Sequence, residues 1–293
     1  MNRQAAIYNE QGMKCDNQGG DKRRAEAAYK KAIQAAPFWS VPWYNLGLLY
    51  KHEHNWPESL RCNQKAAKLD PHDQPTWWNL GIAATALGDW AEARRAWRAY
   101  GIEVPDGEGE IRMQIGLTPM RINPKGTPEV VWCERIDPAR ALIRSVPLPQ
   151  SDHRYGDILL NDGEPKGTRE VHGKRIPVFE ELQLLVPSDY STFEVAVESE
   201  TEETLKALFD LAEAQSLGIE DWGNIRHVCQ ACSEGAPPEA HEHPFISDEA
   251  TTLGVAAETE RQLQELLAAW TTAHPTCRVV EVNCALPVHQ YVN

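Results

Sequence analysis

Four side chains between residues 229 and 243 have the types and the spacing of a zinc site. Cys229 and Cys232 are separated by two residues, so both thiolates could bind one metal ion from a tight turn. His241 and His243 follow with one residue between them. Two sulfur and two nitrogen donors suit tetrahedral Zn²⁺, and we expect such a zinc ion to be structural because the protein would fill all four positions.

Two other interpretations of these residues stay open. Cys229 could be a buried strand residue while the two histidines lie in a solvated loop, because the spacing is not that of a standard zinc finger. A redox pair of the thioredoxin type is disfavoured, since no helix is predicted after the C-x2-C motif. The chain has seven cysteines, an odd number, and its first residues lack the apolar core of a signal peptide. We therefore expect reduced thiols and a cytoplasmic protein.

The candidate zinc ligands lie between two copies of a strand–helix unit. The segment VESETE at 197–202 recurs as VAAETE at 255–260, and later positions keep the same offset. Each copy predicts a strand followed by a helix, over 201–215 and 259–273, and a further strand follows each helix, in NIRHVCQA and in CRVVEVNCAL. The order β-α-β, β-α-β is typical of a ferredoxin-like α+β fold. We assign residues 188–293 to such a domain.

The stretch before it, residues 106–187, alternates short apolar runs such as EVVWCERI and GDILLN with turn signals. This spacing predicts a small antiparallel β-barrel of about five strands. The tract VVWCERIDPARALIRSVPLP, followed by YGDIL, resembles small uncharacterised bacterial domains with a Tyr-Gly-Asp turn. Some of those domains are immunity proteins of toxin systems. The resemblance assigns no residue a role.

Residues 1–105 contain a repeat. Prolines stand at 37, 71 and 105, and we call the constant interval between them the repeat step. Trp43, Leu46 and Gly47 recur at this step as Trp77, Leu80 and Gly81, and small residues recur at Ala25, Ser59 and Ala93. Glycine and other small residues at fixed positions allow two helices to pack closely, and proline ends the second helix. We expect three antiparallel helical hairpins, with Gly12 taking the glycine position of the first hairpin one residue early.

The pattern W-x2-L-G-x2-Y, which WYNLGLLY at 43–50 matches, resembles the tetratricopeptide repeat family over residues 5–105. The resemblance implies an α-helical solenoid in residues 1–105, with a concave groove that binds a protein or peptide. Carried over by position, the groove residues are Tyr44, Asn45, Leu48, Lys51, Trp78, Asn79 and Ile82. Some members clamp the C-terminal carboxylate of a chaperone with basic residues, and these are missing from 74–78. The resemblance therefore does not imply a chaperone co-factor.

The end of the third hairpin is followed by the loop sequence DGEGE at 106–110 and by no closing helix. Terminal repeats of a solenoid need a cover for their last apolar face. We expect Trp90 and Trp97 to lack that cover within the repeats and the downstream chain to supply it.

Composition limits the classes of partner. The 293 residues carry a formal net charge of −14, which disfavours nucleic acid, and no apolar stretch is long enough for a membrane span. Phosphate-binding, dinucleotide-binding, metalloprotease and serine-hydrolase motifs are absent, so we expect no catalytic residues and no cofactor besides the zinc ion. The partner is expected to be a protein or peptide.

We therefore interpret the chain as an adaptor or scaffold that binds a partner through the repeat groove. One alternative is an immunity protein that neutralises a bacterial toxin with its acidic surface or its groove. Another is an enzyme or ligand sensor in the C-terminal half, since catalytic residues scattered along a chain leave no motif.

Overall fold

The computed structural model of the chain describes residues 2–17, 20–171, 173–223 and 250–289. The chain divides into two compact units, residues 1–114 with 137–139, and residues 115–136 with 140–293. The second unit contains two sheets, one in the part expected to be a barrel and one in the part expected to be α+β. The two boundaries between the three domains expected from the sequence stay predictions.

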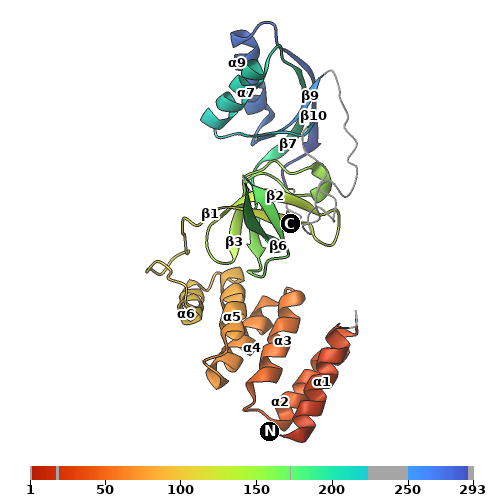
Figure 1. Ribbon diagram of the computed structural model, residues 1–293, viewed down its shortest axis with the longest axis vertical. Helices are drawn as coiled ribbons and strands as arrows, with labels where there is room; N and C mark the ends of the chain where they lie inside the picture. The colour runs from red at the N-terminus through yellow and green to blue at the C-terminus, as the bar shows by residue number, and fades with distance from the viewer. Residues whose placement is uncertain (1, 18–19, 172, 224–249, 290–293) are drawn as a thin grey trace. The chain divides into compact units, whose positions relative to one another are not determined.

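Six helices build the first unit as three antiparallel hairpins, each of which pairs two helices that are consecutive in the chain (Figure 1). The helices are α1 (Arg3–Asn17), α2 (Lys22–Ala35), α3 (Ser40–His52), α4 (Trp56–Leu69), α5 (Gln74–Ala86) and α6 (Trp90–Tyr100). We call α1, α3 and α5 the A helices and α2, α4 and α6 the B helices. The hairpins predicted from the repeat step are confirmed.

Close packing inside each hairpin has the cause that the sequence indicates. A glycine of the A helix faces a large or polar side chain of the B helix, and the pairs are Gly12 with Tyr29, Gly47 with Asn63, and Gly81 with Trp97. A Cβ atom at Gly81 would lie 2.6 Å from the Trp97 ring, and one at Gly47 would lie 2.8 Å from Asn63 Nδ2. Gly12 therefore takes the glycine position of the first hairpin although it lies one residue before the position that the repeat step predicts. This agrees with the longer first turn expected from the sequence.

Among the helices from α2 to α6, all but one begin with a side-chain cap at the N-terminus. Four of them begin after an Asp or Asn whose side chain accepts a hydrogen bond from a backbone N–H three residues later; these caps are Asp21, Asn55, Asp73 and Asp89. Trp39 stands at the same position before α3 and makes no side-chain cap. Losing such a cap costs about 1 kcal/mol, so this turn gives up some stability.

Trp97 is one of the two tryptophans of α6 that were expected to need cover from outside the repeats. Its side chain is fully buried, and its ring lies against Gly81 and edge-on to Trp78, 5.1 Å between ring centroids. After α6 the chain returns along this helix, because Arg94 Nε donates to Pro105 O at 2.9 Å. Trp97 is therefore covered in the full chain, and the expectation that residues downstream of the repeats contribute to this cover stays a prediction. Trp90 is half-buried.

The first sheet of the second unit is a five-stranded barrel with one added strand. Its strands are β1 (Gly116–Ile122), β2 (Glu129–Arg135), β3 (Arg140–Ile143), β4 (Ile158–Asn161), β5 (Gly167–Val171) and β6 (Lys174–Val186). They pair in the order β1-β2-β3-β4-β6, and β1 also pairs with β6, which closes the barrel. β5 pairs only with the first residues of β6. Buried apolar side chains fill the interior: Met120, Ile122, Val131, Cys133, Ala141, Ile143 and Leu159.

The closing pair of the barrel is parallel, with Met120 beside Phe179. Five strands that each run opposite to the previous one leave the first and the last pointing the same way. The barrel predicted from the turn spacing is confirmed. It was expected to be antiparallel throughout, and every pair is antiparallel except the closing pair of β1 and β6.

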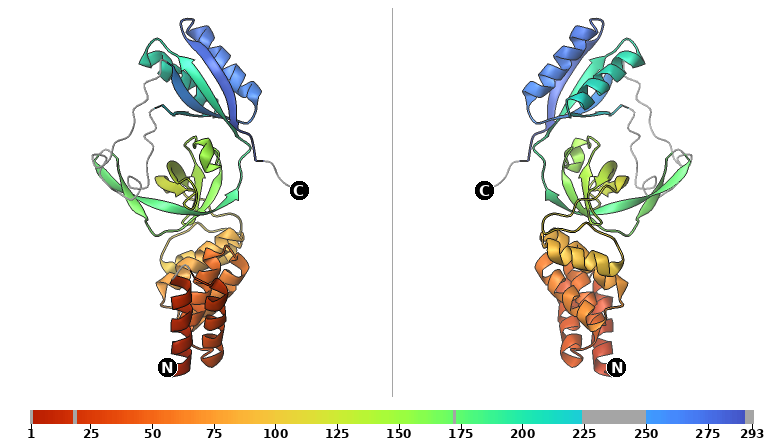
Figure 2. Two further views of the ribbon diagram at one scale, coloured as in Figure 1. Left: turned by 90° about the vertical axis from the view of Figure 1, so that its right-hand side faces the viewer. Right: turned by 90° about the vertical axis from the view of Figure 1, so that its left-hand side faces the viewer.

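The second sheet combines four strands and two helices in the order β7-α7-β8-β9-α9-β10. The elements are β7 (Ser191–Glu198), α7 (Glu202–Ala214), β8 (Gly218–Asp221), β9 (Thr251–Ala257), α9 (Glu260–Ala273) and β10 (Arg278–Leu286). The strand order is β10-β7-β9-β8, all neighbours are antiparallel, and both helices lie on one face of the sheet (Figure 2). The core between helices and sheet contains Phe193, Val195, Val255, Leu266 and Trp270.

Both helices of this sheet start with the same device. Thr201 and Thr259, which occupy matched positions of the two strand–helix copies, each form a capping box at a helix N-terminus. Because Thr201 and Thr259 cap their helices in the same way, the sequence duplication is also present in the local structure.

The strand predicted within 224–231 lies outside the described residues, and the four-residue strand β8 was missed. Among the residues described, no helix is long and apolar enough to cross a membrane.

Candidate functional site

The A helices carry the residues that were predicted to contact a partner. Buried residues of α3 such as Leu46, Leu49 and Tyr50 hold it against neighbouring helices. Its less buried side chains follow one another at three- and four-residue steps, so they form one stripe along the helix. We define the α3 stripe as Val41, Tyr44, Asn45, Leu48 and His52, all of them half-buried or exposed.

Polar contacts join the A helices of neighbouring hairpins. Asn45 Nδ2 on α3 donates to Asn9 Oδ1 on α1 at 3.0 Å. Lys51 Nζ on α3 donates to Asn79 Oδ1 on α5, also at 3.0 Å, and both of these side chains are buried. Asn45 is only half-buried. A half-buried amide can both donate to and accept from the backbone of an extended peptide.

The α5 residues lie in a different environment from their α3 equivalents. Ile82 and Asn79 are buried, whereas Leu48 and Asn45 at the matching positions of α3 are half-buried. Trp78 is half-buried and packs edge-on against Tyr100, with 4.9 Å between ring centroids. The more accessible part of the predicted groove is therefore on α3. The roles of all seven predicted residues in partner binding stay predictions.

Sequence reasoning missed Asn9 as a neighbour of this face. The first hairpin has an extra residue in its turn, so α1 is displaced by one position from the repeat step. Since Gly12 corresponds to Gly47, Asn9 corresponds to Tyr44. The displaced glycine was the signal that could have identified it.

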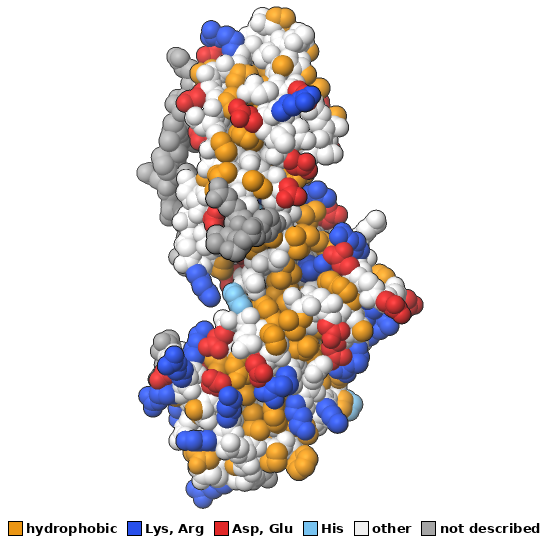
Figure 3. Space-filling view, turned by 180° about the vertical axis from the view of Figure 1, so that it is seen from behind, with side chains coloured by type: hydrophobic (Ala, Val, Ile, Leu, Met, Phe, Trp, Pro, Cys, Tyr) orange, Lys and Arg blue, Asp and Glu red, His pale blue; other side chains and the backbone are white. Residues whose placement is uncertain are grey.

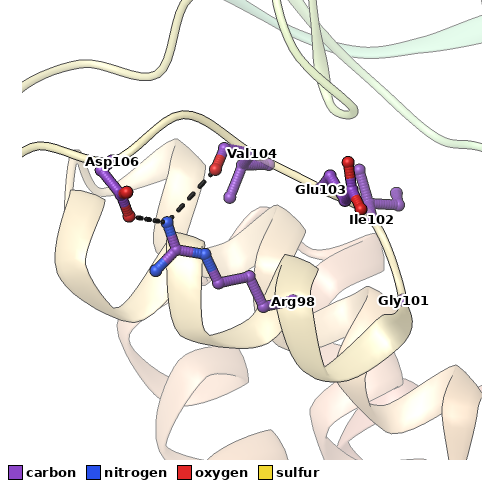
Figure 4. Close-up of a pocket in the computed structure, with 6 residues that line it drawn as sticks. All are labelled: Arg98, Gly101, Ile102, Glu103, Val104 and Asp106. Carbon is purple, nitrogen blue, oxygen red and sulfur yellow. Dashed lines mark hydrogen bonds and ion pairs between the residues drawn. The ribbon is translucent and has the colours of Figure 1, made fainter.

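Apolar side chains gather between Lys and Arg side chains on the face of the repeat unit seen in the lower part of Figure 3. A hollow of about 470 Å³ also opens at the C-terminal end of α6. Its lining residues are Arg98, Gly101, Ile102, Glu103, Val104 and Asp106 (Figure 4). Arg98 Nη2 donates to Val104 O and to Asp106 Oδ1 there, so the chain itself already satisfies the guanidinium. This hollow is less suited to a ligand than the α3 stripe.

In the second unit, the loop between β3 and β4 contacts β8 and the residue that follows it. Trp222 Nε1 donates to Val146 O at 3.0 Å, and a Cβ at Gly218 would lie 2.7 Å from Tyr155 Cδ2. Two carboxylates hold the same loop. Glu220 Oε2 on β8 accepts from Val146 N at 2.8 Å, and Glu129 Oε2 on β2 accepts from Leu148 N at 3.0 Å.

The environment of this loop changes the acidity of its neighbours. Burial raises the pKa of Glu129 to about 7 and also raises the pKa of Glu220. Burial opposes the charged form of His153, but a hydrogen bond from its Nε2 to Glu181 Oε1 at 2.9 Å outweighs this and raises the pKa of His153. These groups are engaged in holding the loop, which makes them structural rather than catalytic candidates.

The predicted zinc ligands Cys229, Cys232, His241 and His243 lie outside the described residues. Within the part of the chain that the structure describes, no three His, Cys, Asp or Glu side chains are grouped so that they could hold a metal ion.

Solved structures similar to this chain are tetratricopeptide repeat domains. The second such domain of Spaghetti (RPAP3), bound to the HSP90 peptide SRMEEVD, is 22% identical; the match covers 34% of this chain and 91% of that one, with a TM-score of 0.32. The TPR2B domain of yeast Sti1, in a complex with pHsp70, is 22% identical over 33% of this chain and 77% of that one, with a TM-score of 0.31. The Arabidopsis OM64 domain is 18% identical over 33% and 79%, also with a TM-score of 0.31. No protein-family model matches the chain, and no curated protein does.

Proposed function

We propose that this protein, whose residues 1–105 form a tetratricopeptide-type repeat segment, is an adaptor that binds a partner protein through its A helices. The α3 stripe is the observation that carries the proposal. Its apolar and amide side chains are available to a partner, while the remaining faces of α3 are used for packing between helices. Large rigid side chains such as Tyr44 are common among the residues that dominate binding energy.

Contacts between hairpins support a preformed binding face. The Asn9–Asn45 and Lys51–Asn79 hydrogen bonds join α1, α3 and α5 side by side. A face that is already ordered loses less conformational entropy when a partner binds. The similar domains of Spaghetti and Sti1 were solved with HSP90 and Hsp70 partners. For this chain we propose only the class of partner, a protein or a peptide.

A binding experiment with matched variants tests this function. We expect the double variant Asn45→Ala, Leu48→Ala to weaken partner binding by more than about tenfold, because a lost hydrogen bond and a lost apolar contact each cost on the order of 1 kcal/mol or more. Lys68→Ala changes an exposed residue of α4 and serves as the control. Equal affinities of both variants, with unchanged circular dichroism, would place the partner elsewhere.

For the second unit we infer a ferredoxin-like arrangement of β7 to β10 with α7 and α9. The antiparallel strand order β10-β7-β9-β8 and the β-α-β-β-α-β order of the elements support it. Because this arrangement hosts many functions, it does not decide between binding and catalysis. We propose that the unit acts by binding, and the engagement of Glu129, Glu220 and His153 with the β3–β4 loop supports this.

Neutralisation of a toxin is the second candidate function. The charge distribution favours it: residues 115–293 carry 29 acidic and 14 basic side chains, whereas residues 1–114 carry 14 and 15. A strongly acidic surface would attract a basic partner such as a nuclease.

A further inference from the structure

The B helices differ from the rest of the chain in their charge. Together α2, α4 and α6 carry 11 Lys or Arg residues and 3 Asp or Glu residues, whereas the A helices carry 3 and 2. Each B helix contributes to this excess, with five basic residues and one acidic residue in α2, and three and one in both α4 and α6. The B helices therefore have a net charge of +8 in a chain whose net charge is −14.

The cations of α4 point away from the A helix of the same hairpin. Asn63 faces Gly47 of α3, and Arg61 and Lys65 each lie two residues from Asn63. At about 100° per residue, two residues turn a side chain by roughly 200° around the helix, so both cations point away from α3. Lys68 follows three residues after Lys65 on the same side. The α3 stripe and these cations therefore occupy different sides of the second hairpin.

Neighbouring B helices continue the basic surface of α4. Gln64 Nε2 on α4 donates to Glu92 Oε1 on α6 at 2.9 Å, so these two helices are side by side. Tyr29 of α2 shares a core cluster with Cys62 of α4, which places α2 next to α4 as well. We define the B stripe as the cations on the outer side of these three helices, exposed except for the half-buried Lys65: Lys30, Arg61, Lys65, Lys68 and Arg95.

Acidic side chains of the B helices neutralise only part of this charge. Each of the three pairs with one cation of its own helix, at N–O distances of 2.6, 2.7 and 2.6 Å. Among the residues that the structure describes, the side chains of Lys65 and Lys68 form no ion pair. Ion pairs on the surface of a helix contribute little to stability, so a carboxylate from outside can compete for the paired cations too.

We propose that the B stripe docks a short Asp- and Glu-rich segment of a second partner protein, different from the partner on the α3 stripe. Carboxylates of such a segment form charge-assisted hydrogen bonds with the Lys and Arg side chains. From Arg61 to Lys68 the stripe is roughly 10 Å long, and three helices packed 8–10 Å apart make it roughly 20 Å wide. An extended segment of about six to eight residues covers that width. The adaptor would then join two proteins.

The charge around the B stripe favours a short segment over larger anionic partners. Within residues 1–114, the parts outside the B helices carry 11 acidic and 4 basic residues. A nucleic acid duplex or a membrane surface extends beyond the stripe and meets this negative charge, whereas a short segment is largely screened from it, since the Debye length is about 8 Å at physiological salt. A second copy of the chain has the same net charge of −14, so two copies repel each other as they approach.

The experiment measures the Kd of the full chain for a fluorescein-labelled octaglutamate peptide by fluorescence anisotropy at about 0.15 M salt. The test variant is Lys65→Gln, Lys68→Gln, which removes the two cations of the stripe that form no ion pair. The matched control, Lys125→Gln, Lys174→Gln, removes two exposed cations of the second unit and changes the net charge equally. Duplex DNA and vesicles that contain phosphatidylserine are titrated in parallel, and sedimentation velocity at several protein concentrations measures self-association.

We expect the test variant to weaken peptide binding by at least about fivefold, because two charge pairs are lost. The control should stay within about twofold of the wild type, and the melting temperatures of both variants should be unaltered. The Asn45→Ala, Leu48→Ala variant should bind the peptide normally, since the α3 stripe lies on another side of the hairpin. A defect of that variant in binding its own partner bears only on the proposed function.

Three results would overturn the inference. Absence of peptide binding, or equal weakening by the test and control variants, would show that the B stripe is not a docking surface. Binding of duplex DNA or vesicles more tightly than the peptide would show that the stripe takes a larger polyanion. Self-association that the test variant abolishes would show that it takes a second copy. Each of these results leaves the proposed function of the α3 stripe standing.

Discussion

Glu129 and Glu220 are carboxylates that the fold has partly removed from water, one from the barrel and one from the adjoining sheet. Both accept hydrogen bonds from the same stretch of main chain, and burial raises the pKa of each. A carboxyl whose pKa is higher in the folded chain than in the unfolded chain binds its proton more tightly when folded. Protonation therefore stabilises the fold below about pH 4.5, and this stabilisation is lost as the pH rises through the folded value.

The free energy of unfolding of the second unit should accordingly fall between pH 5 and pH 8. The raised pKa of His153 acts in the same direction. Glu129→Gln should flatten this dependence and stabilise the chain at pH 8 by roughly 1–3 kcal/mol, because each pKa unit corresponds to about 1.4 kcal/mol. Denaturant titrations at several pH values measure it. Glu170→Gln, which changes an exposed residue of β5, is the control. Parallel pH profiles for wild type and Glu129→Gln would contradict the assignment.

At the scale of elements, the stability of each hairpin depends on how closely the glycine of its A helix packs against the facing side chain of its B helix. A Cβ at Gly81 would lie 2.6–2.7 Å from three atoms of the rigid Trp97 ring, whereas a Cβ at Gly47 would lie 2.8–3.1 Å from the amide end of Asn63; both of these side chains are fully buried. Gly81→Ala should therefore destabilise the repeat unit by roughly 1–3 kcal/mol, and Gly47→Ala by less. Thermal unfolding checks the order. Gly109→Ala, where nothing lies within 4 Å, should have no effect. The reverse order would mean that the Asn63 amide is the more rigid neighbour.

The elements also reveal what the sequence could predict. The repeat step predicted all three hairpins because each one is built from contacts close in the chain. The barrel was predicted as a class, but not its parallel closure, since β1 and β6 are brought together only by closing the sheet. β8 was missed because four residues carry too little periodicity.

For the candidate site, position in the repeat placed the predicted residues on the A helices but could not indicate how deeply each one is buried. Asn45 and Asn79 are equivalent in the repeat, yet one is half-buried and the other buried against Lys51.

At the scale of the whole molecule, charge is segregated between the two units. Residues 1–114 are close to neutral, and the excess of acidic side chains lies in residues 115–293. The two candidate functions therefore differ in their response to salt. A partner on the α3 stripe should change its Kd by less than about threefold between about 0.05 and 0.5 M salt, because screening weakens charge pairs and leaves apolar contacts intact. A basic toxin bound to the acidic unit should lose affinity by tenfold or more over that range. Titration calorimetry at several salt concentrations distinguishes them.

The zinc prediction is tested on the whole protein, because its four ligands lie in a segment outside the described residues. Protein purified without chelator should contain about one equivalent of zinc if Cys229, Cys232, His241 and His243 form a closed site. Elemental analysis checks this. The Cys229→Ser, Cys232→Ser variant should lose the metal, and Cys284→Ser, which changes an exposed cysteine, should retain it. Metal-free wild-type protein would end the hypothesis.

The glycine contacts have a consequence for how such a chain can be rebuilt. Gly12, Gly47 and Gly81 receive a tyrosine, an asparagine and a tryptophan, which differ widely in volume. A chimaera joined at the prolines 37 or 71 would transfer each A helix together with the B helix that fits it. A chimaera joined inside a hairpin would set a tryptophan against a helix shaped for an asparagine. The hairpin, and not the single helix, is therefore the smallest interchangeable part of this protein, and the prolines mark where it can be cut.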